Sequence, residues 1–167
     1  MPIVVPSLQT EFYFKNFSRV PGYHIPDAEG PWVPGEPGTS NKFLSFDCGR
    51  NSFAVLLRCE PGSGIKRHYH TGTVVGYTLQ GSWKYDEYDW IAKPGSFVYE
   101  PAGEAHTLRI LGNEPMLAFF HVLGPHITLD DEGKQAGYVD AFSIIEYCRE
   151  YCQETGTDPS FLDTITS

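Results

Sequence analysis

The sequence predicts an all-β domain, a sandwich or barrel of short strands, followed by one helix. Apolar or alternating runs of four to nine residues, separated by turn residues, recur through the middle of the 167-residue chain. This spacing is typical of antiparallel sheets and not of βαβ units. Near residue 140 the hydrophobic period changes to that of a helix. With 41% hydrophobic residues the chain can bury one sizeable core, so we expect a single domain over 41–167.

Ahead of this domain, residues 1–40 are expected to form an extended arm. Residues 21–38 contain five Pro and four Gly in eighteen positions, which excludes a helix there. Tyr23 and Trp32 indicate that the arm lies against the body of the protein.

Alternating and apolar runs predict the strands of the domain. A hairpin is expected at residues 85–89 (Tyr-Asp-Glu-Tyr-Asp) and another at Leu111–Pro115. The predicted strands are 42–47, 53–60, 66–70, 73–80, 82–85, 88–92, 97–100, 105–110 and 115–123.

A helix is predicted over 140–153, with Asp140 as its N-cap and its apolar side packed on the outside of the β body. One stripe of this helix carries Ala141, Ile144, Ile145, Cys148, Tyr151 and Cys152. The four cysteines of the chain contain no Cys-x-x-Cys pair and no dense framework. A reducing, cytoplasmic setting is therefore expected.

Charge and hydropathy exclude several classes of function. The net charge of −9 leaves no basic stripe to follow a phosphate backbone, so nucleic-acid binding is not expected. No stretch is long and apolar enough to span a membrane, and the first residues lack the basic start of a signal peptide.

Two segments predict a metal site. In Gly64-Ile-Lys-Arg-His68-Tyr-His70 the two histidines are spaced so that both point to one face of a strand. The second segment, Gly95 to His106, ends in a third histidine after a Pro101-Ala-Gly103 turn. Three converging imidazoles that leave coordination positions open are typical of a catalytic metal site. His24 and His126 lie outside both segments and are not included.

The two segments resemble the two motifs of the cupin superfamily. That resemblance implies a double-stranded β-helix, a jelly roll closed into a barrel, with metal held by His68, His70 and His106. The first cupin motif also contains a Glu that three or four residues separate from its second histidine, where this chain has Val74 and Val75. Three neutral imidazoles leave a divalent ion its full charge, so the site is expected to favour an anionic, bidentate ligand.

The chain further resembles the 2,4'-dihydroxyacetophenone dioxygenase group of cupins over most of residues 40–153. The residues that carry this resemblance are Gly76–Tyr85, Asp89-Trp90, Tyr99–Leu108 and Phe119–Val122. It implies non-haem Fe(II) and cleavage by dioxygen of a C–C bond next to a carbonyl. The expected substrate is a small aromatic hydroxyketone or diketone that chelates the iron through two oxygens.

Three further residues are candidates for a catalytic role, each with an alternative. Glu87 reaches the metal or substrate if its turn folds inward, and otherwise is a solvated turn residue. Glu100, extended before Pro101, either accepts a hydrogen bond from a histidine's second nitrogen or lies on the surface. His121 either supports the site or is a hydrogen-bonded core histidine.

The same three histidines suit other functions. Zn(II) or Ni(II) would make a Lewis-acid cyclase, isomerase or hydrolase with identical ligands. The cupin-like parts of zinc-binding anti-sigma factors also resemble this chain, which leaves a metal- or ligand-binding sensor module as a third interpretation. A homodimer or homotetramer is expected because open jelly-roll sheets bury their edges by pairing.

Overall fold

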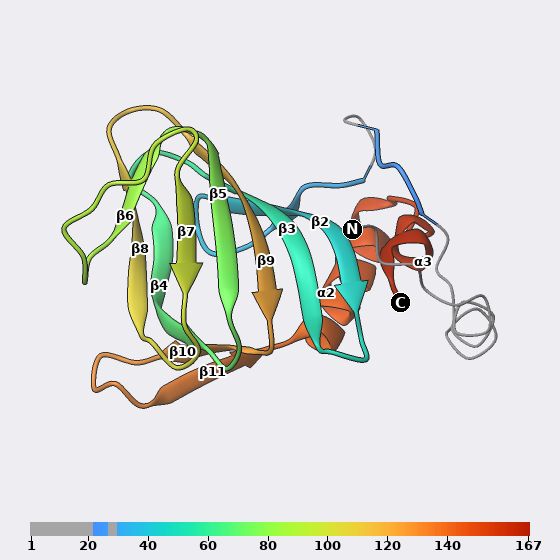
Figure 1. Cartoon of the computed structure of the whole chain (residues 1–167). Helices are drawn as coiled ribbons and strands as arrows, with labels where there is room; N and C mark the ends of the chain where they lie inside the picture. Colours follow the sequence, from blue (N-terminus) through green and yellow to red (C-terminus); the bar gives the residue numbers. More distant parts are fainter. Residues whose placement is uncertain (1–21, 27–29) are drawn as a thin grey trace, which may run out of the picture.

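The computed structural model describes residues 22–26 and 30–167 and confirms the all-β fold. Two antiparallel sheets face each other as a double-stranded β-helix (Figure 1). The six-stranded sheet has the order β1-β2-β3-β9-β5-β7 and the five-stranded sheet the order β11-β10-β4-β8-β6. The strands are β1 (Val33–Pro34), β2 (Thr39–Asp47), β3 (Ser52–Cys59), β4 (Gly64–His70), β5 (Val74–Gln80), β6 (Ser82–Tyr85), β7 (Phe97–Glu100), β8 (His106–Leu111), β9 (Met116–Leu123), β10 (His126–Leu129) and β11 (Gln135–Val139).

The core lies between the two sheets and follows the two-residue period of the strands. Along β9 every second residue is buried, namely Met116, Ala118, Phe120 and Val122. Trp83 on β6 is fully buried among them, and its indole N–H donates to the buried hydroxyl of Thr78 at 2.9 Å. This bond gives the buried indole N–H a partner, as buried polar groups generally require.

The predicted helix is present as α2 (Ala141–Thr155), which lies with α3 (Phe161–Ile165) beside β2 at one side of the sheets (Figure 1). Asp140 caps α2 as predicted, because its carboxylate accepts from the Ser143 N–H at 2.8 Å. The helix ends at Gly156, whose φ of 70° is left-handed, a conformation that glycine adopts without strain. The buried residues of α2 are the predicted Ala141, Ile144, Ile145, Cys148 and Cys152.

Three details of the predicted strand pattern were wrong. Residues 88–92 form a loop with one isolated bridge between Ala92 and Trp83, and Tyr88 and Trp90 stack on each other with centroids 5.4 Å apart. Leu111–Pro115 is not a hairpin, because β8 and β9 belong to different sheets and the chain crosses between them. The short strands β10 and β11 were not predicted at all.

The expected arm is described only in part, since residues 1–21 and 27–29 lie outside the described residues. Within the described part, the Tyr23 hydroxyl donates to the Leu44 carbonyl at 2.8 Å, and β1 pairs with β2 at the edge of the six-stranded sheet. This portion of the arm therefore lies against the body. Across residues 22–26 and 30–167, every helix is too short or too polar to cross a membrane.

Candidate metal centre

Three neighbouring strands, β10, β4 and β8, bring four histidines together inside the barrel. His106 on β8 pairs directly with His68 on β4, and His126 on β10 pairs with His70. Directly paired residues of antiparallel strands point to the same face of the sheet. The structure thus brings together the three histidines of the two motifs, all buried, and adds the half-buried His126.

A β-bulge in β4 turns His68 into the barrel. Ile65 pairs with Leu108 and His68 with His106, so three steps along β4 match two steps along β8. Without the extra residue, strand alternation would place Ile65 and His68 on opposite faces. The motif residue Gly64 lies beside this bulge, and a Cβ there would be 2.2 Å from the Leu108 carbonyl oxygen. Only glycine permits this close approach of the two strands.

The Pro-x-Gly turn of the second motif is tied directly to the first. Gly103 has a φ of 82°, which reverses the chain before His106, and its N–H donates to the carbonyl of His70 at 2.8 Å. This bond fixes the start of β8 against the end of β4. The two sequence motifs are therefore two sides of one structural unit.

The imidazole rings form a compact group. His68 lies with its ring centroid 5.0 Å from that of His70 and 4.6 Å from that of His106. His126 stacks flat on His68, with centroids 4.1 Å apart and an angle of 8°. The Nδ1 of His68 is 2.7 Å from the Lys66 carbonyl. Because a carbonyl can only accept, Nδ1 carries the proton, and Nε2 keeps the lone pair that a metal needs.

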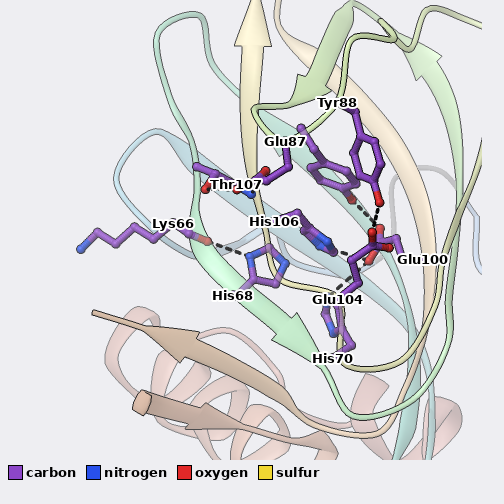
Figure 2. A network of polar contacts seen from close by, with 10 residues as sticks. Lys66, His68, His70, Glu87, Tyr88, Glu100, Glu104, His106 and Thr107 are labelled. Atoms are coloured by element: carbon purple, nitrogen blue, oxygen red, sulfur yellow. Dashed lines mark hydrogen bonds and ion pairs between the residues drawn. The ribbon is translucent and has the colours of Figure 1, made fainter. Parts of the chain in front are cut away.

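Glu100 provides a carboxylate at the place where the motif Glu is missing. Val74, at the position of the motif Glu, pairs directly with Glu100 across β5 and β7, and both side chains are buried. Glu100 therefore enters the barrel from the strand next to the expected one. Its Oε2 lies 3.3 Å from Nε2 of His106 and 3.6 Å from Nε2 of His70 (Figure 2).

Among the residues that the structure describes, three buried atoms of this group make no hydrogen bond: Nδ1 of His70, Oε2 of Glu100 and Nε2 of His106. The last two face each other at 3.3 Å but not in hydrogen-bond geometry. Buried polar groups are normally paired or bind a metal. The ligand atoms of His70, Glu100 and His106 lie within 4.8 Å of one another, and so do those of His68, His70 and His126. These residues fit a divalent cation, because nitrogen and carboxylate donors suit iron, zinc and nickel alike.

Burial keeps the imidazoles neutral, the form in which they bind metal. It lowers the pKa of His68 to about 4, that of His126 to about 3 and that of His70 to about 2. The neighbouring imidazoles act in the same direction, since a charge on one disfavours a charge on the next. At neutral pH these three imidazoles therefore present uncharged nitrogen lone pairs.

Tyr85 holds Glu100 and His106 in place. Its hydroxyl donates to Oε1 of Glu100, and its ring stacks on His106 with centroids 4.0 Å apart. Burial and the adjacent carboxylate raise the pKa of Tyr85 well above its usual value, so it remains a donor at all physiological pH values. Nearby, the Tyr88 hydroxyl donates to Glu104 (Figure 2).

A cavity of about 350 Å³ leads to the cluster. Glu100, His68, His70 and His126 line it at the cluster, and exposed residues of β11 and α2, Val139 and Tyr147, line it at the surface. Most of the remaining wall is apolar: Phe43, Phe53, Val55, Leu57, Ile65, Val74, Leu108, Phe120, Val122 and Ile144. The site thus combines a few converging polar groups with an apolar chamber, as ligand pockets generally do.

The other two candidate residues lie outside both donor groups. Glu87 is exposed, and its carboxylate accepts from the backbone N–H of Thr107 at 2.8 Å and from the Thr107 hydroxyl at 3.1 Å (Figure 2). His121 alternates with the buried residues of β9 and points to the outer face, where it lines a separate cavity with Tyr23, Asp47 and Arg50. Neither motif includes His126, and only its register against His70 reveals it.

Solved structures show the same fold. An RmlC-like cupin protein of Ralstonia eutropha JMP134 is 35% identical, with a TM-score of 0.72 over 77% of this chain and 85% of that one. An acetylacetone dioxygenase of Acinetobacter johnsonii matches at 19% identity and a TM-score of 0.73, over 81% and 96% of the two chains. A chain of the Rhodobacter sphaeroides complex between SigE and the anti-sigma ChrR matches at 18% identity and a TM-score of 0.50, over 56% and 49%.

No curated protein matches the sequence. The family described as ChrR Cupin-like domain matches residues 23–126, a range that contains both motifs, Glu100 and His126. Together with the 35% identity to the Ralstonia cupin over most of both chains, this match shows that the chain belongs to the ChrR cupin-like family of the cupin superfamily.

Proposed function

We propose that the protein is a non-haem Fe(II)-dependent dioxygenase that cleaves a C–C bond next to a carbonyl. The proposed substrate is a small hydroxyketone or diketone with an aromatic ring. One observation carries this proposal: a histidine and carboxylate cluster with unpartnered buried atoms lies at the inner end of an apolar cavity. The acetylacetone dioxygenase that shares the fold adds support at the level of architecture.

The cavity suits a flat apolar body with one polar end. Aromatic and branched side chains, among them Phe43, Phe53 and Phe120, line the chamber, and their surfaces favour a ring over a polar chain. The polar end of the substrate then faces the imidazoles. The cavity volume of about 350 Å³ lies at the lower end of the range of volumes found for ligand pockets. We therefore infer a substrate with one ring and a short side chain.

The residues around the cluster position the reacting groups. His68, His70 and His106 supply ring nitrogens from neighbouring strands, and Tyr85 keeps the carboxylate of Glu100 directed at them. The apolar wall keeps water away from the polar end of the substrate, which strengthens the electrostatic interactions there. When bound, iron would supply the Lewis acidity and the one-electron chemistry with dioxygen that the side chains lack.

Dioxygen uptake tests the proposal. Protein loaded anaerobically with Fe(II) is mixed with a panel of α-hydroxyketones and β-diketones, and oxygen consumption and products are measured. His106→Ala serves as the inactive control and His121→Gln, on the outer face, as the matched active one. We expect uptake that depends on iron, substrate and His106 and yields carboxylic acid products. Iron-loaded protein that consumes no oxygen with any panel member would contradict the dioxygenase proposal.

Two observations support alternative functions, which the same experiment distinguishes. The same donor atoms suit Zn(II) or Ni(II), which would support a cyclase, isomerase or hydrolase reaction. The family that matches this chain is described as a ChrR Cupin-like domain. One solved structure with a chain of the same fold is a complex that contains the anti-sigma ChrR. Stoichiometric zinc binding without oxygen uptake would favour a Lewis-acid enzyme if the panel compounds are converted, and a sensor module if they bind unchanged.

We further propose that the protein forms a homodimer or homotetramer. The outer face of β5 and β7 exposes Tyr77, Phe97 and Tyr99 next to the edge of the six-stranded sheet. Exposed apolar side chains beside an unpaired strand edge favour association with another chain. Sedimentation equilibrium measures the oligomeric state directly, and a monomer would contradict this proposal.

A further inference from the structure

His126 belongs to the cluster by geometry but to neither sequence motif. Its ligand nitrogen lies within 4.8 Å of those of His68 and His70, a second donor group that shares His70 with the group formed by His70, Glu100 and His106. His70 also carries the buried Nδ1, which makes no hydrogen bond within the described part of the chain. An unpartnered nitrogen in a buried group of three imidazoles is the arrangement that a cation satisfies.

The contacts of His126 fix it in this position. Its ring lies flat on His68, with centroids 4.1 Å apart, and perpendicular to His70, with centroids 5.2 Å apart and an angle of 84°. The strand β10 holds it in register with His70 through direct antiparallel pairing. His126 thus sits on a strand and not on a loop, so the sheet fixes the position of its backbone, while its ring is less enclosed than those of the motif histidines.

From this arrangement we infer that His126 is a fourth imidazole ligand of the metal centre, and that it is the ligand which a chelating substrate replaces. The inference rests on the metal site of the proposed function and adds a ligand to it. A resting ion would then be held by protein groups on the side where the substrate enters. Such a ligand protects the ion until a substrate with two oxygen donors competes for the position.

The burial of the four histidines identifies His126 as the replaceable ligand. His68, His70 and His106 have 5%, 7% and 1% of their surface exposed, whereas His126 is half-buried and lines the cavity together with Thr128 and Val139. A substrate that enters through the cavity meets His126, while His106 is not part of the cavity wall. Loss of His126 from the metal leaves its ring room to move, since it is the least enclosed of the four.

Counting nitrogen ligands tests the inference without reference to activity. Full-length protein is loaded with Cu(II), and the bound imidazoles are counted by electron spin echo envelope modulation, before and after addition of acetylacetonate as a bidentate probe. The variants are His126→Gln, with His126→Asn in case the first does not fold, and His121→Gln as the matched control. Circular dichroism verifies that each variant is folded.

We expect four imidazoles in the wild type and in His121→Gln, falling to three with the probe, and three in His126→Gln with or without it. The Kd for Zn(II) should rise in His126→Gln by about tenfold or more, since loss of even an outer partner of a ligand costs this much affinity. Three imidazoles in the wild type, or four after the probe has bound, would overturn the inference and leave the proposed function standing. Failure of the wild type to bind any metal would overturn both.

Discussion

The two sheets supply different chemistry to the same candidate metal centre. The five-stranded sheet contributes four imidazoles from β4, β8 and β10, while the inner face of the six-stranded sheet contributes apolar side chains and one carboxylate, that of Glu100. The six-stranded sheet also carries a histidine, His121, but on its outer face. The difference shows that strand parity and sheet order, more than residue type, decide which histidines can act together.

The largest effect is expected from His70, because it belongs to both donor groups. His70→Ala removes a ligand from each, so we expect the variant to purify without metal and to show no oxygen uptake. The matched change on the other sheet, His121→Ala, should retain full metal content. Metal analysis by inductively coupled plasma mass spectrometry checks both, and equal metal content in the two variants would contradict the assignment of the inner face as the metal site.

The motifs made the convergence of His68, His70 and His106 predictable because the spacing within each motif is local. His68-x-His70 and the turn before His106 are each contained in a few residues, and their meaning follows from strand alternation and turn chemistry. The helix 140–153 was predictable for the same reason, since the N-cap Asp140 and the stripe of α2 are local patterns. In both cases one short stretch of sequence contains the whole signal.

The rest of the site depends on which strands become neighbours. Glu100 faces the histidines because β7 pairs with β5 at Val74, and His126 does so because β10 pairs with β4. The bulge between Ile65 and His68 likewise appears only against β8. Each of these pairings joins segments from different parts of the chain, so no local pattern encodes it. The loop at 88–92 was mistaken for a strand because aromatic residues are typical of strands, whereas Tyr88 and Trp90 stack on each other in the structure.

A second prediction uses the pairing of Val74 with Glu100. Glu100→Val removes the carboxylate and should weaken metal binding by about 10- to 100-fold, the range seen when groups that support a metal site are lost. The double variant Val74→Glu with Glu100→Val returns a carboxylate from the paired position on β5 and should recover part of that affinity. Kd for Zn(II), measured by competition with a chelator, distinguishes the two.

The single variant Val74→Glu is the control for this exchange. It places a second carboxylate in the buried site, next to Glu100, and like charges there disfavour each other. We therefore expect it to be less stable than the double variant. An affinity for the double variant no better than that of Glu100→Val would show that the position of the carboxylate on β7 is specific.

A third prediction concerns the metal-free protein in mild acid. An unfolded histidine binds a proton near pH 6.5, whereas burial lowers the pKa of the folded His68 to about 4 and that of His126 to about 3. Protons therefore favour the unfolded chain, so the free energy of unfolding is highest above pH 6.5 and falls as the pH drops toward 4. The Tm of metal-free protein, recorded by circular dichroism from pH 7.5 to 4, should fall accordingly. His126→Gln should show a shallower fall, and an equally steep one would contradict the role of this buried imidazole.

The smallest effect is expected from His121 on the outer face of the six-stranded sheet. The side chain is partly exposed and lines a cavity with Tyr23, Asp47 and Arg50, on the opposite side of β9 from Phe120 and Val122. Away from such features as cores and ligands, a substitution changes the free energy of unfolding by less than about 0.5 kcal/mol. His121→Gln should therefore leave Kd for Zn(II), oxygen uptake and urea denaturation unchanged within that limit. A loss of oxygen uptake with metal binding intact would mean that the outer cavity communicates with the site, and the contrast between the two faces would no longer separate functional from structural histidines.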